Sequence, residues 1–369
     1  MLIREERKKQ ADWGLLLPVL LVGIIGAVTL YSAAASEPES LQRGLFFRQL
    51  VWLSGGLGLV LISLVFDHKT LYTWAEGIYL ACIALLVGVL FFGTEAGGAR
   101  RWLPLGPVAI QPSEFVKLAI VIILAKHYAR HASDGKLTLR QLVRPVVIIA
   151  VPFTLIYFQP DLGTAMIMVL VALSLTMFVG ISRRTLYLLT GVGLILAPLT
   201  WFFFFHDYQK LRILTFLNPN RDPLGAGYHI IQSKIAIGSG MITGKGYLQG
   251  TQNALAFLPE QHTDFILSVL AEEWGFMGTS LVLLLYLLII VWAISIGYHS
   301  RDLFRQLLSV GVAATIFWPV FVNAGMVMGL LPVVGVPLPL ISYGGSSTIS
   351  FMLGIGLLLN ISMRRSPME

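Results

Sequence analysis

The sequence is short of charged residues and of cysteine. Only 12% of its 369 residues are Asp, Glu, Lys or Arg, whereas 56% are hydrophobic. Globular domains carry about 25% charged residues, so this composition excludes an ordinary soluble fold. Cys82 is the only cysteine, which excludes an intrachain disulfide. The sequence has no HExxH motif and no paired Cys/His spacing, so we expect neither zinc nor haem.

Long apolar segments, in contrast, recur along the whole chain. Each approaches the ~20 residues needed to cross a hydrocarbon core of ~30 Å. We therefore expect an all-α polytopic membrane protein, with a single domain over residues 1–369 and about ten transmembrane helices. The eighth segment is the longest, and Gly275 and Gly278 within it predict a tilt or an interruption. The ten expected spans are residues 13–34, 46–66, 71–93, 113–131, 143–158, 163–181, 185–205, 265–297, 304–330 and 343–362.

Lysine and arginine are concentrated at both termini and in every second loop, for example around residues 126–144. Short cytoplasmic loops are enriched in these residues, so both termini are expected in the cytoplasm. The same placement accounts for the net charge of +7, and no aromatic-basic motif indicates a nucleic-acid partner. Residues 206–263 then form a large extracytoplasmic loop between spans seven and eight. Within it, IIQSKIAIGSG predicts a short amphipathic or re-entrant helix at the membrane interface.

Four ionisable residues near the outer ends of the expected spans are candidates for chemistry. Such groups cost about 2.5–3.5 kcal/mol each on insertion, so they indicate function by default. Glu114 and Lys117 lie on one helical face, which fits either an intrahelical ion pair or a polar cavity with Lys117 on a phosphate. Asp161 begins the sixth span, where it fits a helix cap, a site residue or both. Arg101 lies in the ordered loop before the fourth span.

The glycine-rich stretch GSGMITGKG surrounds Lys245 in the expected outer loop. It is not a P-loop, because Ser239 stands at the first glycine position and Gly246 at the Ser/Thr position. We therefore expect no nucleotide. The glycines fit a flexible surface loop, and Lys245 remains a candidate anion contact.

The stretch LPEQHTDFILSVLAEEWG concentrates acidic residues where the eighth span begins. Asp264 and Glu272 are eight residues apart, so both lie roughly on one helical face, as cavity-lining residues would. Asp264 or Thr263 also fits the N-cap of that helix. The carboxylates of Asp264 and Glu114 leave open a divalent cation, Mg²⁺ or Mn²⁺, bound together with a substrate phosphate.

Several long motifs resemble the SEDS family of cell-wall proteins. They run in the expected order from GARRW at 98–102 to GLLPVVGVPLPLISYGGSS at 329–347, and they include QPSEFVKLA and QPDLGTA. The segments YHIIQSKIAIGSG and GTQNALAFLPEQHTDF resemble the rod-shape-determining, elongation-type branch more than the cell-division branch.

This resemblance implies a ten-helix fold and a peptidoglycan glycosyltransferase of the bacterial cytoplasmic (inner) membrane, with its active site on the outer face. It implies lipid II as acceptor and an undecaprenyl-pyrophosphate glycan as donor, attacked with inversion by the acceptor 4-hydroxyl. It also implies partners, namely an elongation-type class B penicillin-binding transpeptidase and other elongation-complex membrane proteins. By position, Asp264 matches the residue that the family treats as catalytic. The positions that match other functional cavity residues are Arg101, Glu114, Lys117 and Asp161.

Side-chain chemistry agrees with such a reaction. A carboxylate at a partly desolvated interface suits a general base, and Asp264 is the candidate. The candidates to neutralise the leaving pyrophosphate are Arg101, Lys117 and Lys245.

Two other functions remain open from the sequence, a lipid II flippase and a scaffold that recruits a transpeptidase. A flippase needs polar groups spaced through the bilayer, whereas here they gather at the outer ends of spans four, six and eight. A scaffold leaves Asp264 and the other ionisable groups without a role. Both alternatives therefore rank below the enzyme.

Overall fold

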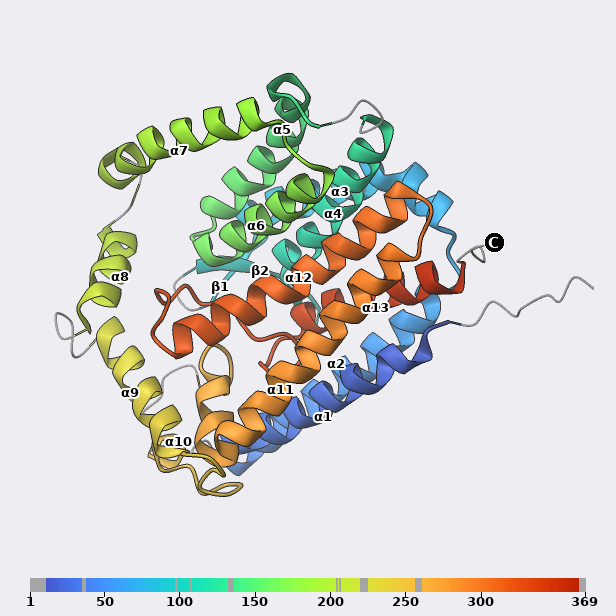
Figure 1. Ribbon diagram of the computed structural model, residues 1–369. Helices are drawn as coiled ribbons and strands as arrows, with labels where there is room; N and C mark the ends of the chain where they lie inside the picture. Colours follow the sequence, from blue (N-terminus) through green and yellow to red (C-terminus); the bar gives the residue numbers. More distant parts are fainter. Residues whose placement is uncertain are drawn as a thin grey trace, which may run out of the picture.

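The computed structural model describes residues 11–34, 38–96, 99–106, 108–131, 136–203, 205, 207–219, 225–255 and 261–364. These residues form a bundle of long helices (Figure 1). The helices are η1 (Trp13–Leu15), α1 (Leu16–Ala33), α2 (Glu39–Ser63), α3 (His68–Phe92), α4 (Pro112–His131), α5 (Leu139–Tyr157), α6 (Leu162–Val179), α7 (Arg183–Phe203), α8 (Asp207–Leu217), α9 (Ala226–Ser239), α10 (Thr251–Ala254), α11 (Ile266–Tyr298), α12 (Leu303–Val327) and α13 (Gly345–Met363). The strands are β1 (Thr94–Ala96), β2 (Ala99–Leu105) and β3 (Val108–Ile110).

In the described part of the chain, nine helices are long and apolar enough to cross a membrane. Together with α4 they account for the ten expected spans. Helix α4 differs from the nine in its charges, Glu114, Lys117, Lys126 and Arg130. It packs against α3, α6 and α12, and every side chain from Val116 to Tyr128 is buried. The charges of α4 are tolerated because this helix is surrounded by protein and not by lipid.

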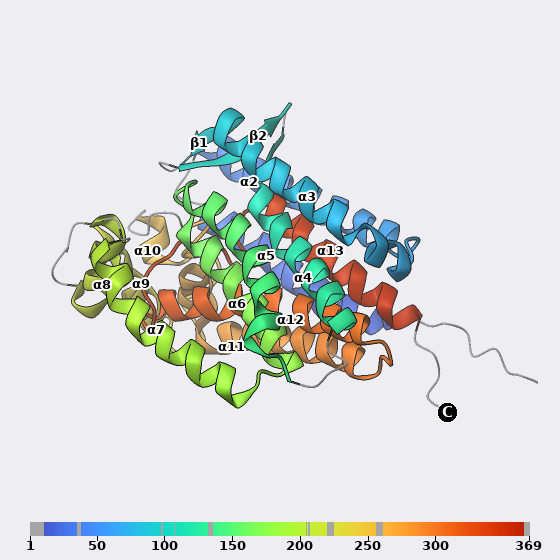
Figure 2. The same cartoon turned by 90° about the horizontal axis from the view of Figure 1, so that it is seen from above.

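Helix α7 lies at the edge of the bundle in two perpendicular views (Figures 1 and 2). None of the residues in its apolar window is buried, whereas Thr185 near the start of the helix is. Helices α8 and α9 continue along this edge (Figure 1). The expected outer loop at 206–263 is thus largely helical where it is described. The helix expected in IIQSKIAIGSG is confirmed as part of α9, which packs on α11; its place at a membrane interface stays a prediction.

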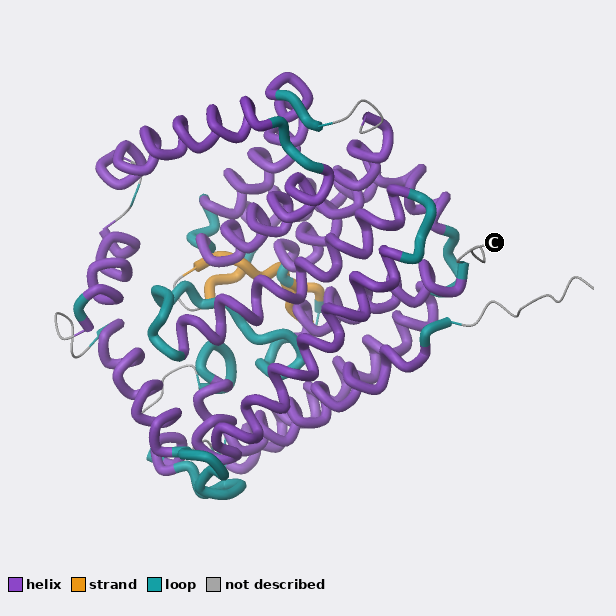
Figure 3. Tube along the Cα trace, viewed as in Figure 1, coloured by secondary structure: helices purple, strands orange, loops and turns teal. Residues whose placement is uncertain are grey.

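The segment before α4 forms a small antiparallel sheet in the order β1-β2-β3 (Figure 3). Thr94 pairs with Trp102, and Leu103 pairs with Ile110. Gly106 supplies the positive φ of 67° at the turn between β2 and β3. The sequence predicted only an ordered loop here, and the structure shows that this loop contains three short strands. The expected fold class, an all-α polytopic membrane protein, is confirmed by the bundle of long helices. The sheet places Arg101 and Trp102 beside the bundle.

The first and last described segments meet at one end of the bundle. The Asp12 amide donates a hydrogen bond of 3.1 Å to the Ser362 hydroxyl. An even number of crossings requires the two termini to lie on the same side of a membrane. The contact therefore agrees with ten spans, while the side on which the termini lie stays a prediction.

Helix α11 is broken at Gly275, where φ is 64° and ψ is −162°. The loop before α10 satisfies the backbone groups that the break exposes. Lys245 N–H donates to the Glu272 carbonyl at 3.0 Å, and Phe276 N–H donates to the Met241 carbonyl at 2.9 Å. The interruption expected near Gly275 is therefore confirmed, and its cause is a loop docked into the helix.

We expect Gly275→Ala to lower the thermal stability of the protein. A Cβ there would lie 2.3 Å from the Gly244 nitrogen and 2.6 Å from the Ile242 carbonyl oxygen, both backbone atoms. The backbone conformation at Gly275, with positive φ and ψ of −162°, is essentially restricted to glycine and costs another residue about 1–3 kcal/mol. The matched control is Gly193→Ala in α7, where a Cβ meets nothing within 4 Å. Thermal unfolding in detergent should show a lower midpoint for Gly275→Ala only; equal midpoints for the two variants would contradict the docked break.

Candidate functional site

One cavity of about 630 Å³ collects most of the residues that the sequence singled out. Its lining includes Arg101, Glu114, Asp161 and Asp264. The walls come from segments far apart in the chain: β2, the starts of α4 and α6, helix α8, the turn before α11 and the segment leading into α13. This volume falls in the roughly 300–1,000 Å³ range of small-molecule sites. A cavity walled by so many segments is a candidate binding site.

Asp161 is nearly buried at one wall of the cavity. Its side chain accepts a hydrogen bond of 3.2 Å from the Thr164 amide, so it caps α6. The Gln111 amide donates to its other oxygen at 3.1 Å, and an Arg101 guanidinium nitrogen lies 3.9 Å away. The sequence left open whether Asp161 is a helix cap, a site residue or both. In the structure this side chain caps α6 and also lines the cavity.

Arg101 reaches the cavity from β2 with its side chain 29% exposed. Its Nε atom is buried and has no hydrogen-bond partner among the described residues. Buried polar groups in proteins are normally satisfied. The partly exposed guanidinium of Arg101 therefore brings a positive charge to the cavity wall, although its Nε atom itself is inaccessible.

Glu114 and Lys117 form the ion pair that their spacing predicted. The ammonium of Lys117 donates to both Glu114 carboxylate oxygens, at 2.8 and 2.9 Å. Both side chains are buried, and Ser350 donates to the Glu114 carbonyl at 2.9 Å. Lys117 lines a smaller pocket of about 30 Å³ that shares Glu114 and Ser347 with the cavity. The pair therefore lies at the inner end of the cavity.

Asp264 lies in the turn just before α11, and its side chain is partly exposed to the cavity. The Asn323 amide holds this turn by donating to the Asp264 carbonyl at 2.9 Å and to the Val336 carbonyl at 2.7 Å. Its carboxylate lies against Gly335, where a Cβ would be 3.2 Å from Oδ2. The described helix begins after Asp264, with Phe265 at the N-cap position. The expected cap at Thr263 or Asp264 is therefore not the one observed.

A second clamp fixes the same turn. Tyr343 N–H donates to the His262 carbonyl at 2.9 Å, and the Ser342 hydroxyl donates to the Thr263 carbonyl at 2.5 Å. The segment that leads into α13 thus lies along the turn that carries Asp264. Such backbone support preorganises a side chain for chemistry.

Lys245 and Glu272 lie elsewhere. Lys245 donates to Glu272 at 2.6 Å, and the Thr251 and Gln252 amides donate to the same carboxylate oxygen at 2.9 and 3.1 Å. Neither residue is among those that line the cavity. The structure therefore brings these two predicted site residues together, but not with Asp264. Glu272 therefore does not line the cavity that contains Asp264, and a contact between Lys245 and the substrate stays a prediction.

Helix α8 contributes cavity residues that sequence analysis did not identify. Gln209, Arg212 and Ile213 of α8 line the cavity, as does Phe205 before this helix. The spacing of the three helical residues, i, i+3 and i+4, is that of one face of a helix, and this was the signal available in the sequence. Arg212 adds a second arginine to the cavity wall.

The described residues do not form a metal site by themselves. They contain no group of three or more His, Cys, Asp or Glu side chains arranged to hold an ion. Both oxygens of Glu114 accept hydrogen bonds from Lys117, which opposes a role as metal ligand. A cation shared between Asp264 and a substrate phosphate stays a prediction.

Comparison with known sequences gives one family. The family model described as a cell cycle protein, and named for FtsW, RodA and SpoVE, matches residues 12–367. The peptidoglycan glycosyltransferase MrdB of Escherichia coli K12 is 42% identical over 366 residues, which cover 98% of this chain and 96% of that protein.

Solved structures give the same result. One similar structure is a chain of a peptidoglycan synthase complex described as coordinating polymerization and crosslinking. It matches with a TM-score of 0.81 and 32% sequence identity, and the match covers 96% of this chain and 98% of that chain. The rod shape determining protein RodA of Thermus thermophilus matches with a TM-score of 0.71 and 28% identity, over 97% of this chain and 98% of that one.

Proposed function

The chain belongs to the FtsW/RodA/SpoVE family and is a peptidoglycan glycosyltransferase; we propose that it polymerises lipid II in the cavity that contains Asp264. The acceptor is lipid II, and the donor is the growing undecaprenyl-pyrophosphate glycan. The single observation that carries this proposal is that one cavity brings a carboxylate from the turn before α11 together with two arginines, Arg101 and Arg212. A base and a phosphate-binding wall are what this reaction needs.

Asp264 is the proposed general base. It takes the proton of the acceptor 4-hydroxyl as that oxygen forms its bond to the anomeric carbon of the donor. The bond from the anomeric carbon to the pyrophosphate oxygen breaks, and the lipid pyrophosphate leaves with the electron pair. Attack on the face opposite the leaving group inverts an α-linked donor to a β-linked product. By analogy with inverting hydrolases, no covalent enzyme intermediate is needed.

Positively charged side chains at the cavity are proposed to stabilise the leaving lipid pyrophosphate. Arg101, whose guanidinium is partly exposed, and Arg212 of α8 are the proposed contacts of the pyrophosphate. Lys117 sits one layer deeper, paired with Glu114. Cations aimed at the charge that develops on a leaving phosphate stabilise the transition state more than the ground state.

We further propose an inner-membrane orientation with both termini in the cytoplasm and the cavity at the outer face. The cavity is lined by the start of α13, whereas the Asp12–Ser362 contact lies near its end, so cavity and termini are at opposite ends of this helix. The proposed partner is an elongation-type class B penicillin-binding transpeptidase, acting with other elongation-complex membrane proteins. The structural relative from a polymerising and crosslinking complex supports such a partner.

The decisive experiment supplies labelled lipid II, with Mg²⁺ or Mn²⁺, to the purified protein reconstituted in vesicles with and without a class B transpeptidase. We expect a ladder of glycan polymers that a muramidase digests. Transfer of lipid II across the vesicle membrane without any polymer would instead establish a flippase. Transpeptidase recruitment with neither polymer nor transfer would establish a scaffold.

A further inference from the structure

A second, apolar cleft lies at the opposite end of the bundle from the Asp264 cavity. Its volume is about 180 Å³. Its lining includes Leu59 and Ile62 of α2, Leu71 of α3, Leu308 of α12 and Leu357 of α13. Helix α2 packs on α1 and α13, whereas α3 packs on α4 and α5. The cleft thus lies between α2 and α3, two membrane helices that pack against different helices.

The mouth of the cleft is apolar and exposed. Ile62 is 54% exposed and Phe66 is 59% exposed, although both line the cleft. Ile62 belongs to a helix long and apolar enough to span a membrane, and Phe66 lies three residues after its end, so we expect both side chains to face acyl chains. The cleft is therefore open sideways to lipid.

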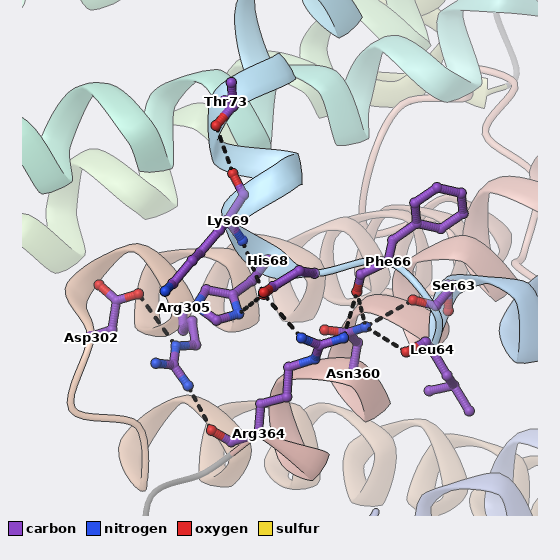
Figure 4. Close-up of polar contacts among 11 residues, drawn as sticks. Ser63, Leu64, Phe66, His68, Lys69, Thr73, Asp302, Arg305, Asn360 and Arg364 are labelled. Atoms are coloured by element: carbon purple, nitrogen blue, oxygen red, sulfur yellow. Dashed lines mark hydrogen bonds and ion pairs between the residues drawn. The ribbon is translucent and has the colours of Figure 1, made fainter.

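The end of the cleft is polar and tightly bonded (Figure 4). The Asn360 amide donates to the Ser63 carbonyl at 2.8 Å and to the Phe66 carbonyl at 2.6 Å. Arg364 donates to the same Phe66 carbonyl at 3.1 Å. These bonds tie the α2–α3 turn to the end of α13, so the polar end is a fixed feature of the fold.

Charged side chains surround this polar end. Asp67 lies 3.1 Å from an Arg364 guanidinium nitrogen, and Asp302 accepts from Arg305 at 3.3 Å. The hydrogen bond from the Lys69 amide lowers the pKa of the Asp67 carboxyl, so this acid stays ionised. Two acids are thus matched by two arginines.

Lys69 gives this group of charged side chains a net positive charge. Its side chain extends toward the same group of charges (Figure 4), and the residue is exposed. The titratable residues that line this end of the cleft are Asp67 and His68, whose Nδ1 lies 2.7 Å from the Asp67 carboxylate. Beside them, the cations Lys69, Arg305 and Arg364 outnumber the carboxylates of Asp67 and Asp302 by one. The group next to the apolar cleft therefore has an excess of positive charge for an anion.

We propose that this cleft binds one anionic phospholipid of the cytoplasmic leaflet, with an acyl chain between α2 and α3 and its phosphate near Lys69, Arg305 and Arg364. Basic pockets between membrane helices on the cytoplasmic side bind anionic headgroups, which have the charge that this polar end lacks. The apolar walls select a lipid over a free phosphate, because a soluble anion leaves them unoccupied. The bound lipid stabilises the junction of α2, α3, α12 and α13.

The test measures thermal unfolding of the purified chain in neutral detergent, titrated with phosphatidylglycerol, phosphatidylcholine or glycerol 3-phosphate, with native mass spectrometry to count retained lipid. We expect phosphatidylglycerol to raise the unfolding midpoint above the value in phosphatidylcholine, and glycerol 3-phosphate to leave it unchanged. Lys69→Gln should weaken the phosphatidylglycerol affinity about fivefold, the value for one lost basic contact of about 1 kcal/mol.

Two further variants keep the outcome interpretable. Arg183→Gln removes an exposed basic residue at the start of α7, away from the cleft, and should leave the affinity unchanged. Leu357→Trp fills the cleft without touching a charge and should reduce retention of both lipids, while size-exclusion chromatography reports its fold. Equal stabilisation by both lipids, equal stabilisation by glycerol 3-phosphate, or an equal loss in Arg183→Gln would each overturn the proposal.

Discussion

Asp264→Asn is expected to abolish glycan polymerisation while leaving the fold intact. Asparagine has nearly the shape of aspartate, and the bonds that hold this turn use backbone carbonyls, so the turn should persist. The substitution removes the group that accepts the acceptor proton, and a positioned base contributes about 10²–10⁴-fold to rate. Polymer formed from labelled lipid II, followed on gels over time, should fall by at least that lower factor.

The control for Asp264→Asn is Glu39→Gln, which neutralises an exposed acid paired with Arg43 at the start of α2. This variant should polymerise at the normal rate. A manganese titration separates the two roles of Asp264: recovery of Asp264→Asn at high Mn²⁺ indicates a metal ligand, and no recovery indicates the base. Polymerisation by Asp264→Asn at the rate of Glu39→Gln would refute the catalytic assignment.

Lys117→Met is expected to be the most destabilising substitution around the cavity. Lys117 is the partner of both Glu114 oxygens, and both side chains are buried. Removing one member of a buried ion pair costs roughly 3–5 kcal/mol, because the remaining charge is left without compensation. Unfolding in detergent should show this loss as a clearly lower midpoint. The double variant Lys117→Met with Glu114→Gln should recover most of the stability, since no buried charge remains.

The double variant also separates the two interpretations of this ion pair. A pair that serves only the fold should leave the stabilised double variant active. A pair that takes part in phosphate binding should leave it folded but impaired in polymerisation. Wild-type stability of the single Lys117→Met variant would show that the pair is not a desolvated ion pair at all.

The apolar spans and the break in α11 could be predicted from the sequence. Both depend on local properties: a run of apolar residues of membrane length must be helical because lipid offers no hydrogen bonds to the backbone. Gly275 marks a position where the helix can leave its regular path, and the structure breaks there. The candidate residues Arg101, Glu114, Asp161 and Asp264 were also found from the sequence, since each is charged next to an apolar run.

Only the tertiary structure decided which charged residues meet. Lys245 and Glu272 are charged residues in an apolar chain, as the cavity residues are. In the structure, however, they form an ion pair with each other at the loop docked into α11. Arg212 lies in a segment with no motif of its own, and it lines the cavity because one face of α8 forms part of the cavity wall. Such partnerships depend on contacts between segments distant in sequence. The physical reason is that hydropathy is a property of neighbouring residues, whereas charge pairing is set by how the helices pack.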